Sequence, residues 1–419
     1  MPDLSWPTIL LIIELSLKAA MIAVVLLRKG RSPAVRLAWI VLIIALPFIG
    51  SLSYLLLGTT RLGRKRIRRH ATIVAEIPAS LEAHAPELEK IIGRVPEAYQ
   101  SIANLAEAVG ASMVVGGNHA ELFSETEKLI ETLVADIDAA EDHCHLLYYI
   151  VLDDQAGQAI CGALQRAAGR GVTCRLLVDA VGSKAFLKSS LPGSLRGAGV
   201  EVVAALPVNI IRSAFARMDI RNHRKVAVID GRIGYLGSQN IAEASFAPKP
   251  EFAPWVDASV RVEGPVVHDL QALFVQDWYM DTDASLAYML GSPVCNADST
   301  MPVQVMATGP NFDSLALREL LQTAVFAARE ELVLTTPYFA PDEATEAAIC
   351  IAALRGVQTH LVVPARNDSK MVAAASRSRY QRLQAAGVNI HEFKGGLLHA
   401  KTMTIDKATA MIGSANLDR

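Results

Sequence analysis

Two histidines, His223 and His399, lie in the same local sequence pattern. Each is followed by a lysine at +2, an aspartate at +7, a Gly-Ser pair, and an asparagine at +17; the two copies are 176 residues apart. The candidate site residues are therefore His223, Lys225, Asp230, Ser238 and Asn240 in the first copy, and His399, Lys401, Asp406, Ser414 and Asn416 in the second. Together the copies offer two imidazoles, two ammonium groups and several neutral donors to one phosphate.

The chemistry open to this set is phosphoryl transfer through a covalent intermediate. A neutral imidazole can attack phosphorus, and an imidazolium can protonate a leaving alkoxide, so two histidines on opposite sides of a phosphate can share these tasks. The lysines and asparagines would donate to the equatorial oxygens, where the transition state holds its charge. We therefore predict that no metal or other cofactor is needed. Asp230 and Asp406 end predicted strands, which favours a structural role for them within the motif.

The motif spacing also predicts the elements that hold these side chains. Each His and Lys precedes or begins an apolar strand, at residues 225–230 and 401–406. Because side chains alternate along a strand, positions two apart share a face and can point at the same phosphate. The Gly-Ser pairs end the next strand in a tight turn, so Ser238 and Ser414 are predicted phosphate donors.

A longer repeat surrounds the motif. Apolar strands alternate with helical patterns, and Arg-Gly-Val and Ala-Gly-Val strings recur 185 and 188 residues apart. Such alternation predicts an α/β fold with helix-covered sheets. The predicted elements are helices at 125–140, 157–168, 314–329 and 342–354 and strands at 146–152, 174–179, 332–336 and 359–363.

Two long apolar runs, residues 7–27 and 37–57, open the chain. Each has about the length, roughly 20 residues, that crosses a bilayer as a helix. Glu14 and Lys18 are four positions apart, so they can pair along one helix face and reduce the cost of burial. We predict a membrane anchor over residues 1–60 with two transmembrane helices; a signal peptide and a half-inserted hairpin are the alternatives.

Charge is distributed unevenly along the chain. Residues 28–69 carry ten basic and no acidic side chains, whereas residues 70–419 carry 29 basic and 40 acidic ones. Positive segments flanking membrane helices favour the cytoplasmic side and attract anionic lipid. An acidic body argues against binding of nucleic acid. Residues 61–120 are thus expected to form a basic stop-transfer segment and helical linker, with the body in the cytoplasm.

The repeated motif resembles the HKD signature of the phospholipase D superfamily. The similarity to bacterial cardiolipin synthases extends over nearly the whole chain, including the paired N-terminal runs. The similar strings are residues 222–231, 255–257, 261–265, 335–343, 375–378, 398–402 and 413–418.

This resemblance implies two phospholipase D-like repeats, at 121–295 and 296–419, related by a pseudo-two-fold axis and built on mixed, mostly parallel sheets. It implies a phosphatidyltransferase of a bacterial inner membrane. One phosphatidylglycerol would pass its phosphatidyl group to another, giving cardiolipin and glycerol through a phosphohistidine. His223 would be the nucleophile and His399 the general acid and base, although the symmetric sequence also allows the reverse. Acceptor lipid and oligomeric state stay open.

The resemblance further implies that an acid downstream of each histidine orients its ring, which fixes the tautomer. For His223 the matching residue is Asp257. The matching position for His399 would lie beyond Arg419. We therefore expect the second repeat to be C-terminally incomplete and the chain to have low activity.

Three other functions are compatible with the motifs. A hydrolytic phospholipase D would use water as acceptor and release phosphatidic acid. A nuclease of the same superfamily would act on DNA, which the acidic body and apolar runs disfavour. A catalytically inactive membrane scaffold is the third.

Overall fold

The computed structural model describes nine segments of the chain. These are residues 5–28, 33–58, 64–82, 92–110, 112–207, 221–246, 248–290, 301–309 and 315–418. The chain divides into two compact units, one comprising residues 1–67 and 208–220, the other residues 68–207 and 221–419.

The first unit contains apolar helices. α1 (Trp6–Leu27) is long and apolar enough to cross a membrane, and within it Glu14 and Lys18 form the predicted ion pair at 2.6 Å. The second apolar run differs from the prediction, because it forms two shorter helices, α2 (Pro33–Ala45) and α3 (Ile49–Leu57). Pro47 lies in the break, where a ring without an N–H interrupts helical hydrogen bonding. Among the described residues, α1 is therefore the one candidate membrane span.

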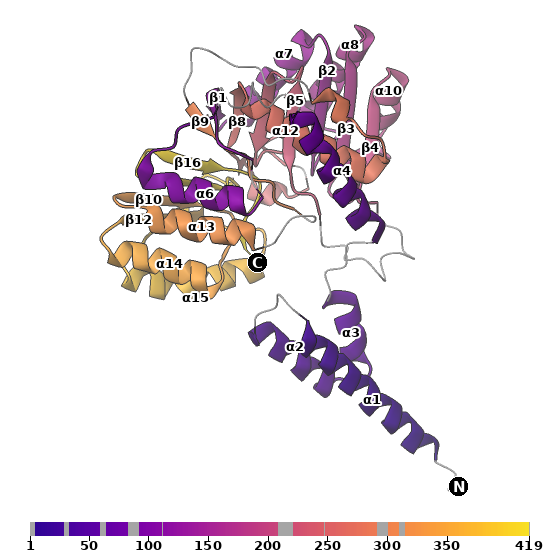
Figure 1. The fold of residues 1–419 in the computed structure, drawn as a ribbon, viewed down its shortest axis with the longest axis vertical. Helices are drawn as coiled ribbons and strands as arrows, with labels where there is room; N and C mark the ends of the chain where they lie inside the picture. The colour runs from indigo at the N-terminus through magenta and orange to yellow at the C-terminus, as the bar shows by residue number, and fades with distance from the viewer. Residues whose placement is uncertain are drawn as a thin grey trace. The chain divides into compact units, whose positions relative to one another are not determined.

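The second unit contains two mixed sheets (Figure 1). In spatial order, the larger sheet consists of β4 (Glu201–Ala205), β3 (Thr173–Asp179), β2 (His143–Tyr148), β5 (Lys225–Ile229), β6 (Ile233–Gly237), β8 (Ser259–Glu263), β1 (Val115–Phe123) and β9 (Met301–Val303). The smaller consists of β13 (Asn389–Phe393), β12 (Gln358–Pro364), β10 (Glu331–Thr335), β15 (Thr402–Ile405) and β16 (Thr409–Ile412).

The same strand pattern occurs in both sheets. β4-β3-β2 and β13-β12-β10 each pair in parallel, and the motif strand, β5 or β15, then joins antiparallel to β2 or β10. Each motif strand continues into an antiparallel hairpin, with β6 or β16. The two motif strands thus occupy equivalent places in their sheets, each between the last of the parallel strands and its own hairpin partner.

Helices cover these sheets because their apolar faces are buried against alternating strand residues. In the larger sheet, α7 (Thr126–Ala139), α8 (Gln155–Gly169) and α10 (Leu191–Gly197) pack on one face, and α12 (Val266–Thr282) packs on the other. In the smaller sheet, α13 (Ala316–Ala327), α14 (Glu343–Leu354) and α15 (Lys370–Ala385) share one core with α6 (Gln100–Ala108). β10 and β12 alternate buried and half-buried residues, so this sheet has one deeply buried face.

Two short strand pairs bring the repeated segments to one site. β7 (Trp255–Val256), which follows the first motif, pairs in parallel with β14 (Leu397–Leu398), which precedes His399. The backbone N–H of His399 also donates to the carbonyl oxygen of Val256 at 2.7 Å. The second motif is therefore anchored directly on the segment that carries Asp257.

Candidate active site

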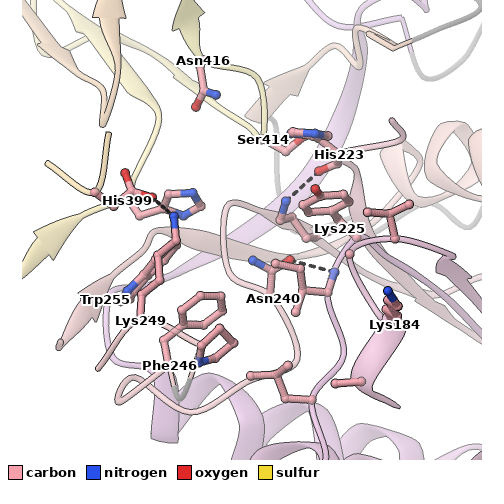
Figure 2. Close-up of a pocket in the computed structure, with 18 of the residues that line it drawn as sticks. Lys184, His223, Lys225, Asn240, Phe246, Lys249, Trp255, His399, Ser414 and Asn416 are labelled. Atoms are coloured by element: carbon pink, nitrogen blue, oxygen red, sulfur yellow. Dashed lines mark hydrogen bonds and ion pairs between the residues drawn. The ribbon is translucent and has the colours of Figure 1, made fainter. Parts of the chain in front are cut away.

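Both motif histidines line one cavity of about 640 Å³ (Figure 2). Figure 2 places His223, Ser414 and Lys225 on one side and His399, Trp255 and Lys249 on the other. The motif residues that line the cavity are His223, Lys225, Asn240, His399, Lys401, Ser414 and Asn416. The two copies of the motif therefore form a single site.

His223 is held by residues on both sides of it in the sequence. The side chain of Asn222 donates to Asp277 on α12 at 2.9 Å, and the guanidinium of Arg224 forms an ion pair with the same carboxylate. The ring of His223 stacks on Tyr149 with centroids 4.2 Å apart. His223 is thus fixed in direction while its ring stays accessible from the cavity.

His399 is oriented by a carboxylate. Its Nδ1 lies 2.7 Å from Oδ1 of Asp257, whose side chain is 4% exposed. Because the carboxylate accepts, Nδ1 carries the proton and Nε2 is left for chemistry. The hydroxyl of Ser238 donates to the same Asp257 oxygen at 2.5 Å.

Each motif lysine donates to the backbone carbonyl oxygen of its own histidine. The distance is 2.8 Å from Nζ of Lys225 to His223 and 2.5 Å from Nζ of Lys401 to His399. Both ammonium groups are buried. Burial lowers the pKa of Lys225 to about 8, with Asp257 acting in the opposite direction. Two buried cations beside the histidines form a region suited to an anionic phosphate.

These charges set the protonation of the site. Burial, followed by repulsion from Lys401, lowers the pKa of His399 to about 4, although Asp257 opposes this shift. Desolvation and the nearby Lys225 and Lys401 also lower the pKa of His223. Burial alone would raise the pKa of Asp257, but His399, Lys401 and Ser238 hold it well below its usual range. The site therefore combines neutral imidazoles with an ionised carboxylate at neutral pH.

Comparison with known proteins agrees with this geometry. A family model described as cardiolipin synthase, PLD-like domain, matches residues 133–278 and 321–419, and another described as phospholipase D-nuclease N-terminal matches residues 19–58. The chain belongs to the PLD-like cardiolipin synthase family.

Curated relatives match along most of their length. Cardiolipin synthase A of Edwardsiella ictaluri is 36% identical, with 94% of this chain and 82% of that protein covered. Cardiolipin synthase A of Erwinia tasmaniensis is also 36% identical, with 99% and 86% covered. Among solved structures, phosphatidylserine synthase of Haemophilus influenzae has a TM-score of 0.50 at 13% identity, with 74% and 81% covered, and so shares the fold.

Two predicted roles need correction in this cardiolipin synthase-family chain. Asp257 does not contact the His223 ring; it orients His399, because the β7–β14 pairing places the second motif beside it. Among the described residues, no carboxylate bonds to the His223 ring. Ser238 is fully buried behind the cavity and bonds to Asp257, so it is not placed to contact phosphate.

The motif aspartates Asp230 and Asp406 do not line the cavity, in keeping with the structural role that their place at the strand ends favoured. Asp230 accepts hydrogen bonds at 2.9 Å from the backbone N–H groups of residues 141–143. Asp406 accepts corresponding bonds from residues 329–331 at 2.7 to 3.2 Å. Both lie at the far end of the motif strand and neither lines the cavity. They tie each strand hairpin to the start of the neighbouring strand.

Sequence reasoning missed several residues of the cavity wall. Trp255 packs on His399 with ring centroids 4.8 Å apart and on Phe246 at 4.0 Å. Asp368 accepts a hydrogen bond from the Tyr338 hydroxyl at 2.8 Å and forms an ion pair with Lys249. Trp255 lies in one of the strings that carry the family resemblance, which was the available signal. The Asp368 pairings join distant segments and leave no local pattern.

Proposed function

We propose that this chain transfers a phosphatidyl group from one phosphatidylglycerol to another, giving cardiolipin and glycerol. The observation that carries this proposal is the meeting of both motif histidines in one lysine-lined cavity, with a carboxylate behind one of them. The names of the curated relatives support the same reaction. In this proposal phosphate oxygens are bound by Lys225, Lys401, Asn240, Ser414 and Asn416, which all line the cavity.

In the first step, the neutral imidazole of His223 attacks the donor phosphorus. A P–N bond forms as the bond to the glycerol oxygen breaks, and that oxygen takes a proton from His399. Asp257 supports the second role, because a carboxylate on Nδ1 stabilises the imidazolium form. The negative phosphodiester between the rings also favours the imidazolium.

The second step reverses these roles on another lipid. A glycerol hydroxyl of the acceptor gives its proton to His399 and attacks phosphorus, so a P–O bond forms as the P–N bond breaks. His399 is thereby protonated again for the next cycle. The exchange of one phosphodiester for another needs protection of the intermediate from water. Leu152 and Phe246, which line the cavity, supply apolar wall for this.

The anchor and the repeat belong to the same proposal. We place α1 across a bacterial inner membrane as part of a multi-pass anchor at residues 1–60, with the linker at 61–120 and the body in the cytoplasm. The basic residues 28–69 support this orientation. The matching strand order of the two sheets supports pseudo-two-fold repeats at 121–295 and 296–419.

The test incubates phosphatidylglycerol labelled in the diacylglycerol moiety with membranes containing the wild-type chain, His223→Ala or His399→Ala. The wild type should release labelled cardiolipin, and both variants should lose it. His399→Ala should retain label covalently on His223, because attack continues while turnover stops. Exposed His119→Ala is the matched control and should behave as wild type. Phosphatidic acid as the main product would show that the chain hydrolyses its substrate rather than transferring the phosphatidyl group. Absence of any product from the wild type would contradict the proposal.

A further inference from the structure

A hydrogen-bond donor that has no acceptor within the described part of the chain lies next to His399. The indole Nε1 of Trp255 is buried and makes no hydrogen bond within the described part of the chain, and Trp255 as a whole is 8% exposed. An unsatisfied buried donor is costly, because it has given up water without gaining another acceptor. Trp255 lines the cavity, so a ligand there could supply the missing acceptor.

A second set of polar side chains lies on the same wall of the cavity as Trp255. The carboxylate of Asp368 is 4% exposed, faces the cavity, and is shared between the Tyr338 hydroxyl and the Lys249 ammonium. Lys249 belongs to the first motif's half and Asp368 to the second, so the two halves build this wall jointly. The wall thus combines a fixed carboxylate, an ammonium, a phenol and an indole N–H.

We propose that Trp255, Asp368, Tyr338 and Lys249 form a subsite for the glycerol diol, both as leaving group and as acceptor headgroup. This rests on the proposed function, in which His399 exchanges a proton with the oxygen that leaves or enters. That oxygen must lie on the His399 side of phosphorus, where Trp255 and Lys249 also lie (Figure 2).

The chemistry of the wall suits neighbouring hydroxyls. A hydroxyl both donates and accepts, so it can donate to Asp368 while accepting from Lys249 or from the Trp255 indole. A carboxylate would repel a second phosphate at this position but accepts neutral hydroxyls. A site with fixed polar groups discriminates strongly against an alcohol that lacks the second hydroxyl, because these groups then lose their partners.

The test measures how the phosphohistidine intermediate partitions between two competing alcohols. The donor is phosphatidyl-p-nitrophenol, whose leaving group needs neither protonation nor glycerol recognition. Glycerol and 1-propanol compete as acceptors in neutral detergent micelles, and the ratio of phosphatidylglycerol to phosphatidylpropanol is measured. Because both products come from one intermediate, the ratio does not depend on how much enzyme is folded.

The wild type should favour glycerol. Trp255→Phe, which keeps the ring, and Asp368→Asn should each lower the ratio about tenfold. Lys184→Gln, on the His223 side of the same cavity, should leave it unchanged. Unchanged ratios in Trp255→Phe and Asp368→Asn, or a wild type that does not favour glycerol, would overturn the subsite while leaving phosphatidyl transfer intact. Absence of both products from the wild type would instead contradict the proposed function.

Discussion

Nδ1 of His399 lies 2.7 Å from Oδ1 of Asp257, although 142 positions separate the two residues. The contact exists because β14 pairs with β7, which places the second histidine beside the segment that follows the first motif. Ser238, at the end of the first motif's hairpin, donates to the same carboxylate. Each motif therefore contributes to the orientation of His399, and neither half holds it alone.

Asp257→Asn should lower the rate of phosphatidyl transfer by about 10- to 100-fold. The amide can still accept from Nδ1, but it has no charge to stabilise the imidazolium. The loss should appear in kcat, with the thermal midpoint little changed. Asp269→Asn is the matched control, since burial raises the pKa of Asp269 to about 6 and this residue does not line the cavity. Equal loss in both variants would indicate a general effect on folding.

Ser238→Ala tests whether this hydroxyl supports Asp257 or binds phosphate. Loss of one hydrogen bond to the carboxylate should lower kcat about fivefold, while KM for phosphatidylglycerol stays constant. Asn240→Ala should raise KM, because Asn240 lines the cavity and is a proposed phosphate donor. A rise in KM with unchanged kcat for Ser238→Ala would restore the phosphate-binding role.

Lys225→Gln should raise the pKa of His223. Desolvation and then Lys225 lower this pKa in the wild type, so removal of the ammonium relieves one source of repulsion. Diethylpyrocarbonate reacts with neutral imidazole, so the midpoint of its rate against pH reports the pKa, followed on the His223 peptide by mass spectrometry. Lys370→Gln, outside the cavity, is the charge-matched control. A midpoint that stays or moves to lower pH in Lys225→Gln would contradict this electrostatic account.

Individual helices and strands could be predicted from the sequence because each depends on the pattern of its own neighbouring residues. The helix predicted at 342–354 is α14 (Glu343–Leu354), and the strand predicted at 174–179 is β3 (Thr173–Asp179). Apolar periodicity and flanking glycines fix such elements within a few positions. The motif likewise predicted that His223 and His399 meet, and both line one cavity.

The partners of the motif residues could not be predicted in the same way. The family resemblance assigned Asp257 to His223 as the acid downstream of that histidine. The observed partner of Asp257 is His399, because β7 pairs with β14. The pairing of Lys249 with Asp368 is equally remote in sequence. The second apolar run was predicted as one helix because membrane helices tolerate proline, whereas the chain forms two helices on either side of Pro47.

Asp406→Asn should reduce stability at neutral pH by about 1–3 kcal/mol, because three backbone N–H groups lose a charged acceptor. Asparagine tolerates the positive φ of 52° at this position, so the change isolates the charge. Burial acts to raise the pKa of Asp406, but the backbone N–H groups of residues 329–331 hold it below its usual value. A depressed folded-state pKa stabilises the protein above the unfolded pKa, about 3.9, and this contribution is lost as pH falls through the folded value.

The difference in thermal midpoint between wild type and Asp406→Asn should therefore be constant near neutrality and shrink below about pH 4. Circular dichroism of the protein in neutral detergent at pH 7, 5, 4 and 3 measures it. Exposed Glu392→Gln on β13, in the same sheet, controls for loss of one negative charge and should stay close to wild type. A difference that persists or widens on acidification would show that Asp406 stabilises the hairpin through shape rather than through its ionised carboxylate.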